Sequence, residues 1–315
     1  MFMKKSNRSS VLNIEDTGFE RFSVKNIIGL VVFTPLFFFW YIKFIGLLPE
    51  HIILYVLFVS TYFGNKFSRE IILSFAIYVV YWAIYDSFRV FPNYEFNTVH
   101  IQQPYELDKA LFGVNYQGQL LTLSEYFAKV HIPFFDVLAG IFYINWVPIP
   151  IALSLYFYLK KRPLFYSFAY CFVFVNFLGW IIYYSYPAAP PWYVAEHGFA
   201  LDFHTQGSEA GLRYFDQILD VNLFKGMYVR NSNVFAAMPS LHSAFPLLTL
   251  YFGLKARLGW FNIFFVIFCF GIWGAAVYTS HHYVIDVLCG ITVASIGIFL
   301  FEKFLDKRVQ ELFAK

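Results

Sequence analysis

Long apolar runs separated by short polar segments make up most of this 315-residue chain. A helix needs about 20 consecutive apolar residues to cross the hydrocarbon core of a bilayer, and eight runs approach that length. They are residues 27–46, 50–67, 71–90, 132–157, 163–185, 240–256, 260–279 and 282–302. The second has a short apolar core, and the sixth reaches full length only with its polar first turn. The pattern predicts an all-α membrane protein with about eight transmembrane helices.

These runs predict one membrane domain, residues 27–302, between an N-terminal tail at 1–26 and a C-terminal tail at 303–315. Two long segments, 91–131 and 186–239, interrupt the runs.

The first long segment predicts structure of its own. Residues 104–130 carry apolar side chains at helical spacing, and Thr122 and Glu125 have the spacing of a capping box. We expect short helices lying in the membrane interface there. The second segment opens at 186–193 with three prolines, which exclude a helix interior, and with aromatic side chains that suit the lipid headgroup layer.

Composition agrees with this class, since the chain is 59% hydrophobic and only 14% charged, whereas soluble domains contain about 25% charged residues. The net charge of +3 is scattered over short polar segments, so we expect no nucleic-acid partner. The cysteines, Cys171, Cys269 and Cys289, lie inside apolar runs without metal-ligand spacing. Buried free thiols are therefore expected, with no metal site and no cofactor.

The distribution of basic residues predicts the orientation. With the N-terminus in the cytoplasm, 16 of the 23 Lys and Arg residues fall in cytoplasmic segments, as the positive-inside rule requires. Both termini are then cytoplasmic. His242 and His282 lie at the extracytoplasmic, or lumenal, ends of their spans, on the same side as the two long segments.

These two histidines carry the candidate chemistry. His282 and Asp286 are four residues apart, so on a helix they share one face, and a carboxylate there can fix the imidazole tautomer. Ser240 is a good N-cap residue, and the free N–H groups that follow it form an anion site. His281 would be rotated by about 100° from His282 on a helix, so we expect it at the membrane interface.

The chain resembles the type-2 phosphatidic acid phosphatase superfamily, which has a six-helix membrane core. The second motif of that superfamily, Pro-Ser-x-His, matches Pro239, Ser240 and His242. Its third motif ends in His-x-x-x-Asp and matches His282 and Asp286. The resemblance covers residues of about 100–300, which would form the catalytic core.

Within the superfamily the chain is most similar to the inositol phosphorylceramide synthase branch, through residues 186–193, 237–243 and 278–283. It departs from the phosphatase pattern at Ala276, where the phosphatases have an arginine. Their first motif, Lys-x6-Arg-Pro, has no match, because residues 161–163 are similar but lie on the cytoplasmic side of the predicted topology.

The resemblance implies a role for each motif residue. His282 would attack phosphorus and form a phosphohistidine, with Asp286 orienting it. His242 would act as general acid and then as general base. Ser240 would hold phosphoryl oxygens. The outer-side cations that could replace the missing arginine, and the aromatic residues that could contact substrate, are Arg213, Lys225, Arg230, Tyr186 and Trp192.

The expected activity is transfer of a phospho-headgroup between membrane lipids, with phosphatidylinositol as donor and ceramide or a similar lipid as acceptor. Two alternatives remain open. One is a lipid phosphate phosphatase acting on phosphatidate or a polyprenyl diphosphate. The other is a non-enzymatic transporter, although the paired, interrupted spans of a transporter are not evident. The oligomeric state is left open.

Overall fold

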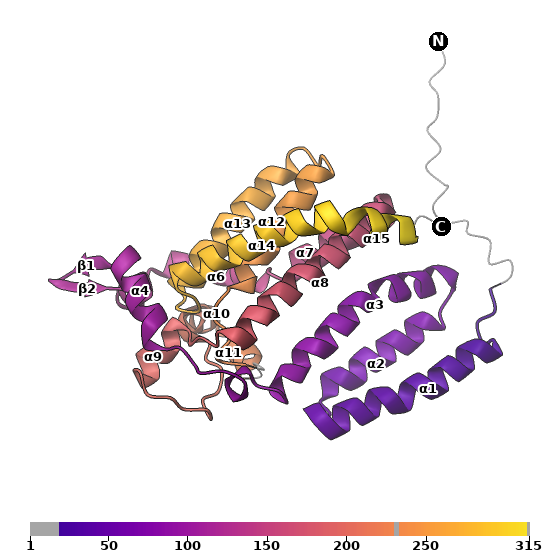
Figure 1. The fold of residues 1–315 in the computed structure, drawn as a ribbon, viewed down its shortest axis with the longest axis horizontal. Helices are drawn as coiled ribbons and strands as arrows, with labels where there is room; N and C mark the ends of the chain where they lie inside the picture. The colour runs from indigo at the N-terminus through magenta and orange to yellow at the C-terminus, as the bar shows by residue number, and fades with distance from the viewer. Residues whose placement is uncertain (1–18, 230–232, 314–315) are drawn as a thin grey trace, which may run out of the picture. The chain divides into compact units, whose positions relative to one another are not determined.

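The computed structural model describes residues 19–229 and 233–313, which are almost entirely helical. Contacts along the chain group it into two compact units, Met1–Val90 and Phe91–Lys315. The all-α class predicted from the apolar runs is therefore confirmed (Figure 1).

The first unit is a helical hairpin extended by a third helix. It contains α1 (Val24–Trp40), the π-helical η1 (Tyr41–Ile45), α2 (Pro49–Tyr62), α3 (Lys66–Asp86) and η2 (Ser87–Arg89). Helix α3 begins at a capping box, in which Asn65 Oδ1 accepts from the Ser68 N–H at 2.8 Å. His51 of α2 is buried, and its Nε2 lies 3.3 Å from Asp86 Oδ2 at the end of α3. This contact joins α2 to α3 at one end of the unit.

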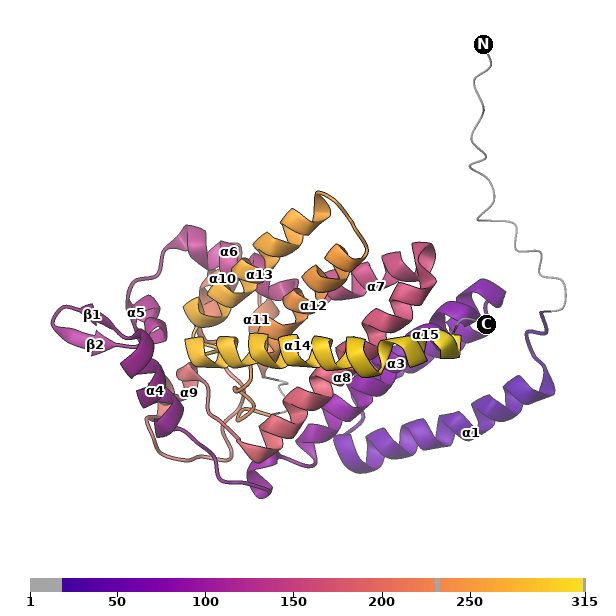
Figure 2. The same ribbon diagram turned by 45° about the horizontal axis from the view of Figure 1, so that its top comes forward.

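The second unit contains the long helices of the rest of the chain. They are α8 (Arg162–Ser185), α12 (Leu241–Lys255), α13 (Phe261–Tyr278) and α14 (Val284–Phe304). Helix α12 begins within one histidine motif and α14 within the other. Helices α12, α13 and α14 lie side by side (Figures 1 and 2), and α8 packs against both α12 and α14. The buried side chains between them are mainly aromatic, including Phe168, Phe245 and Phe252.

In the described residues, five helices are long and apolar enough to cross a membrane: Val24–Ile45, Lys66–Arg89, Arg162–Ser185, Phe261–Tyr278 and Val284–Phe304. Helices α2 and α12 have only 14 and 15 residues, so they fall short of a full span. The total of eight spans therefore stays a prediction.

The predicted span at 132–157 is two helices, α6 (Pro133–Ile144) and α7 (Pro148–Lys160), bent by 40°. Pro148 and Pro150 have no amide hydrogen, so the helical ladder cannot run through this point. At the end of α6 the Asn145 side chain donates to the Ile141 carbonyl at 2.8 Å, because the Asn145 backbone N–H bonds to the Phe142 carbonyl instead. The pair can be counted as a sixth, broken span.

The segment at 91–131 folds into small elements, as expected. It contains η3 (Asn93–Glu95), α4 (Gln102–Phe112), an antiparallel hairpin of β1 (Val114–Tyr116) and β2 (Gln119–Leu121), and α5 (Leu123–Lys129). The predicted capping box is present, because the Glu125 N–H donates to Thr122 Oγ1 at 3.2 Å and the Thr122 N–H donates to Glu125 Oε2 at 2.8 Å.

The segment at 186–239 contains α9 (Pro191–His197), η4 (Ala210–Leu212), α10 (Arg213–Leu219) and α11 (Leu223–Tyr228). Its first residues lie between two other stretches. Ala188 pairs with His100 on one side and with Ala236 on the other. Buried Asn93 also donates to the carbonyls of Tyr183 and Phe235, at 2.8 and 2.9 Å. These contacts hold the two long segments together and join the first of them to α8.

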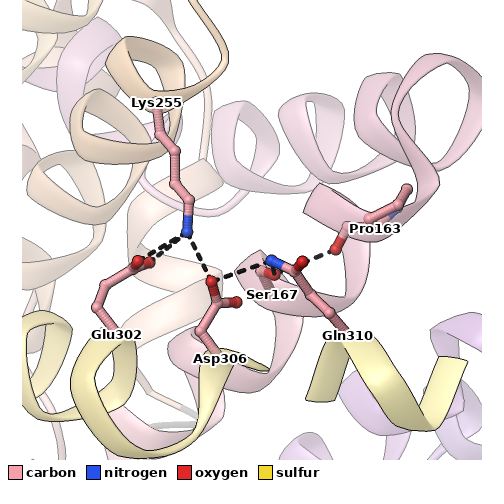
Figure 3. A network of polar contacts seen from close by, with 6 residues as sticks. All are labelled: Pro163, Ser167, Lys255, Glu302, Asp306 and Gln310. Carbon is pink, nitrogen blue, oxygen red and sulfur yellow. Dashed lines mark hydrogen bonds and ion pairs between the residues drawn. The ribbon is translucent and has the colours of Figure 1, made fainter. Parts of the chain in front are cut away.

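At the opposite end of α12, one lysine joins three helices. Figure 3 shows Lys255 directed at Glu302 of α14 and at Asp306 of α15 (Asp306–Phe313). The Nζ–oxygen distances are 2.6 Å to Glu302 Oε1 and 2.8 Å to Asp306 Oδ2. Gln310 extends the cluster from Asp306 to Ser167 of α8. The cluster ties α8, α12 and α14 together where the spans end.

Candidate active site

The two histidine motifs meet where α12 and α14 begin. The Ser240 N–H donates to the Asp286 carbonyl at 2.9 Å, so the N-terminal ends of the two helices are joined by backbone. A Cβ at Gly290 would collide with the Ser240 carbonyl, so glycine is needed at this crossing. The turn between α13 and α14 is held by the Ala276 carbonyl, which accepts from the N–H groups of both His281 and His282.

His242 and His282 contact each other directly. Nδ1 of His242 lies 3.1 Å from Nε2 of His282, which is hydrogen-bonding distance. One nitrogen must carry the proton and the other the lone pair. His282 is 5% exposed. The rings of Tyr143 and Trp146 lie 5.0 and 4.5 Å from the ring of His242, between centroids, and line its other side.

Asp286 lies next to His282, but not by the helical geometry expected from the spacing. His282 precedes Tyr283, the N-cap of α14, and is outside the helix. Asp286 Oδ2 accepts the Tyr283 N–H at 2.8 Å and lies 3.7 Å from His282 Nδ1. The carboxylate therefore caps the helix and lies beside the imidazole, at a distance slightly longer than a hydrogen bond.

Ser240 occupies the N-cap position of α12 and is fully buried, but its side chain does not cap the helix. Its Oγ accepts from the Ser243 hydroxyl at 3.1 Å. The Ser243 N–H donates to the Ser240 carbonyl at 3.1 Å, whereas the first N–H groups of an α-helix have no carbonyl partner within it. The anion site expected in this first turn stays a prediction.

His281 is buried, at 5% exposed, which corrects the expectation that it lies at the membrane interface. The expectation assumed a helix, whereas residues 279–283 form a turn. Nδ1 of His281 lies 3.0 Å from Thr279 Oγ1, and its ring lies between those of Tyr143 and Tyr228. Burial lowers the pKa of His281 well below its usual value, and the nearby His282 and His242 lower it further, so His281 is neutral.

The described candidate cations lie on the short helices α10 and α11, and neither contacts the histidine pair. Arg213 begins α10 and Lys225 lies in α11, and both are exposed. The guanidinium of Arg213 lies over the ring of Tyr214, 4.9 Å from its centroid. In the described part of the chain, no hydrogen bond or ion pair joins either cation to the two histidines. Arg230 lies outside the described residues.

The two candidate aromatic residues are structural neighbours of the site. Tyr186 stacks on His100 with ring centroids 3.9 Å apart, and its hydroxyl donates to Gln103 at 3.0 Å. Trp192 is buried, and its backbone N–H donates to the Ser280 carbonyl at 3.0 Å. Trp192 therefore positions the turn that carries His282 through its backbone.

Sequence reasoning missed Asp108 of α4, which is fully buried against the start of α14. Its Oδ1 accepts the Ile285 N–H at 3.1 Å. Burial raises the pKa of Asp108 to about 6; the hydrogen bond from Ile285 lowers it, and the nearby Asp286 raises it. Two carboxylates from separate segments thus cap the helix that follows His282. Asp108 is followed by Lys109 in a segment whose pattern predicts only a short interfacial helix, so nothing in the sequence indicated this role.

Comparison with known proteins identifies the family. A model of the PAP2 superfamily matches residues 121–300, which include all of the residues at the histidine pair. The phosphoinositol dihydroceramide synthase of Bacteroides thetaiotaomicron is 42% identical over 287 residues, which is 90% of this chain and 94% of the other.

The inositol phosphorylceramide synthase of Candida albicans is 30% identical over 218 residues, which is 66% of this chain and 44% of the other. The catalytic subunit of the same enzyme from Saccharomyces cerevisiae is 31% identical over 132 residues, 42% of this chain and 32% of the other. No solved structure matches the chain.

The similarity predicted from the two motifs is therefore confirmed, and so is the expectation of an enzyme. The chain belongs to the PAP2 superfamily and, within it, to the branch of the inositol phosphorylceramide synthases.

Proposed function

We propose that this enzyme transfers phosphoinositol from phosphatidylinositol to a ceramide, with release of diacylglycerol. The direct His242–His282 contact, with Asp286 beside it, is the observation that carries the proposal. The relative with 42% identity over nearly its whole length is named for the same class of product. Ala276, where the resemblance places an arginine in the phosphatases, supports the transferase over the plain phosphatase.

In the first step, the lone pair on Nε2 of His282 forms a bond to phosphorus. The bond from phosphorus to the diacylglycerol oxygen breaks, and that oxygen takes a proton from His242. Asp286 stabilises the positive charge that develops on His282. The N–H groups at the start of α12 are directed at the phosphoryl oxygens as their charge grows.

In the second step, His242 accepts the proton of the ceramide hydroxyl, whose oxygen attacks phosphorus. The phosphorus–nitrogen bond breaks and restores the neutral imidazole of His282. One pair of histidines can perform both steps because the proton that His242 gives up in the first is returned in the second. No net proton is consumed, and no further reactant is required.

The site belongs to a multi-pass membrane protein, as the apolar helices and the relatives both indicate. We propose that both termini are cytoplasmic and that the histidine pair faces the extracytoplasmic or lumenal side, where both lipids can enter from the same leaflet. The distribution of Lys and Arg supports this orientation. This orientation requires eight membrane crossings. Six of them are helices long and apolar enough to cross a membrane, when α6 and α7 are counted as one span.

The test is turnover of labelled phosphatidylinositol by purified protein, with and without ceramide. We expect labelled inositol phosphorylceramide only when ceramide is present, and none from His282→Ala. Inositol phosphate released at the same rate without ceramide would instead identify a phosphatase. Full activity of His282→Ala would exclude the histidine pair as the site of reaction.

A further inference from the structure

The side chain of His281 is buried beside the histidine pair, and one of its nitrogens has no partner among the described residues. His281 is 5% exposed, the same fraction as the proposed nucleophile His282. Its ring and the ring of His242 both contact Tyr143, with centroid distances of 5.1 and 5.0 Å. No group in the described part of the chain hydrogen-bonds to Nε2 of His281, which is itself buried. Buried polar atoms in folded proteins are nearly always paired, so this nitrogen indicates a missing partner.

The hydrogen bonds of Thr279 fix the position of the proton on His281. The Thr279 hydroxyl donates its one hydrogen to the Ala275 carbonyl at 2.7 Å. Its oxygen lies 3.0 Å from Nδ1 of His281 and must therefore accept from that nitrogen. Because burial keeps His281 neutral, Nε2 then carries a lone pair. The backbone of Ser208 also lies near the ring, but it does not hydrogen-bond to Nε2. The partner that Nε2 lacks is consequently a hydrogen-bond donor.

The turn that carries His281 is held from several sides. The Gly211 N–H donates to the Thr279 carbonyl at 2.9 Å, and the Trp192 backbone N–H donates to the Ser280 carbonyl at 3.0 Å. Ser280 has a φ of +61°, in the left-handed region that residues other than glycine rarely adopt. A conformation of this kind persists only where the surrounding contacts fix it. The position of the His281 ring is therefore set by the fold before any substrate binds.

The substrates of the proposed function differ in the hydrogen-bond donors that they offer. The phosphodiester and the fatty acyl esters of phosphatidylinositol contain only acceptors, so the lone pair of a neutral imidazole would repel them. The donors of this lipid are the hydroxyl groups of its inositol ring. Ceramide offers an amide N–H and hydroxyl groups, but in the proposed mechanism it reacts in the second step alone. Inositol is bound to phosphorus in both steps, and His281 is adjacent in the chain to His282.

We propose that Nε2 of His281 accepts a hydrogen bond from an inositol hydroxyl and so makes the enzyme specific for an inositol headgroup. The inference rests on the proposed function, because it requires phosphatidylinositol as the donor lipid. His281 holds the headgroup while His282 carries the phosphoryl group, so the headgroup stays in place as diacylglycerol leaves and ceramide enters. A site built to hydrogen-bond a substrate hydroxyl rejects analogues that lack it, since the buried acceptor is then left unpaired.

The test is a thermodynamic cycle between His281 and the hydroxyl groups of the substrate. Purified wild-type protein is assayed with ceramide and with phosphatidylinositols that each lack one ring hydroxyl. We expect one of these analogues to lower kcat/KM roughly tenfold, the effect of a hydrogen bond lost in a buried site. His281→Phe keeps a ring between Tyr143 and Tyr228 and should cause a similar loss with phosphatidylinositol. With the sensitive analogue it should cause no further loss, because the hydrogen bond is already absent.

His281→Gln should recover part of the loss, because its amide oxygen can accept the same hydrogen bond. His51→Phe is the matched control. His51 is also 5% exposed, but it lies in α2, and both of its ring nitrogens have partners, the Leu48 N–H and the Asp86 carboxylate. This substitution should leave the ratio of activities with phosphatidylinositol and with the sensitive analogue unchanged.

Wild-type protein that uses every analogue as well as phosphatidylinositol would overturn the inference, and this measurement stands even if His281→Phe does not fold. An equal loss from His281→Phe with every analogue would also overturn it, and would assign the histidine to the phosphoryl group or to the turn. So would a loss that disappears only with ceramides that are methylated at the amide or lack the secondary hydroxyl, which would assign Nε2 to the acceptor. Failure of the proposed function is distinguishable, because wild-type protein would then form no inositol phosphorylceramide at all.

Discussion

Nδ1 of His242 and Nε2 of His282 lie 3.1 Å apart although 40 residues separate them in the sequence. This distance is too short for a phosphorus atom to lie between the two nitrogens. In the proposed mechanism, binding of a phosphoryl group replaces the hydrogen bond between them, and His282 turns its lone pair to phosphorus while His242 turns its proton to the ester oxygen. The contact between the histidines would hold both rings in place before the substrate binds.

His242→Ala should lower kcat by roughly 10²–10⁴-fold, the usual contribution of a general acid and base. The fall should be smaller at a given pH when the leaving alcohol is a good leaving group, because such a group needs less protonation. Rates with phosphatidylinositol and with an activated aryl ester of phosphoinositol measure this difference. An equal fall with both substrates would contradict the role of His242 as acid.

Asp286→Asn should lower kcat by about a hundredfold and change KM little. Its amide can still cap α14 through its oxygen, but it loses the charge that lies 3.7 Å from His282 Nδ1 and stabilises the imidazolium. Steady-state kinetics with saturating ceramide measure the change. The thermal midpoint serves as control and should move little, since the Tyr283 N–H keeps an acceptor. A loss of activity that only follows a loss of folded protein would contradict this role.

Asp108 should make the stability of the protein depend on pH between about 4 and 6. Burial raises its pKa to about 6, so in this range the folded state binds more protons than the unfolded state. The free energy of unfolding must therefore fall as the pH rises through the window. Asp108→Asn keeps an acceptor for the Ile285 N–H and removes the titration.

Thermal midpoints in detergent from pH 4 to pH 8 test this prediction. The variant should lose the part of the slope that Asp108 contributes, and above pH 6 it should be more stable than wild type by a few degrees. Parallel curves for the two proteins would show that Asp108 does not titrate in this range.

Lys255→Met should destabilise the protein by about 2 kcal/mol, between the values for exposed and for buried ion pairs. The change leaves Glu302 and Asp306 without the ammonium that lies 2.6 and 2.8 Å away. Burial raises the pKa of Asp306, but hydrogen bonds from Lys255 and its neighbours bring it below its usual value. The contribution of this group is therefore present at neutral pH and lost in acid.

Unfolding in denaturant at pH 7 measures the loss, and Lys307→Met is the matched control. The ammonium of Lys307 lies 3.8 Å from Glu311 on an exposed face, so its removal should change stability by less than about 0.5 kcal/mol. Equal effects of the two substitutions would show that the Lys255 cluster contributes no more than a surface pair.

The sequence alone determined the class of protein, because a chain that is 59% hydrophobic in long runs can satisfy its backbone in lipid only as helices. It also pointed to His242, His282 and Asp286 as candidate site residues, since their spacing is local and belongs to two short motifs. The capping box at Thr122 and Glu125 was predictable for the same reason: its hydrogen bonds join residues three apart.

The tertiary structure decided what depends on contacts between distant segments. It brought Asp108 to Ile285 across 177 residues, and it placed the histidine rings within hydrogen-bonding distance. It buried His281, because a turn replaced the helix on which the expected orientation depended. Periodicity describes only how residues follow one another along a single helix. Which helix end meets which loop is set by packing of the whole bundle, and a single sequence does not contain that pairing in local form.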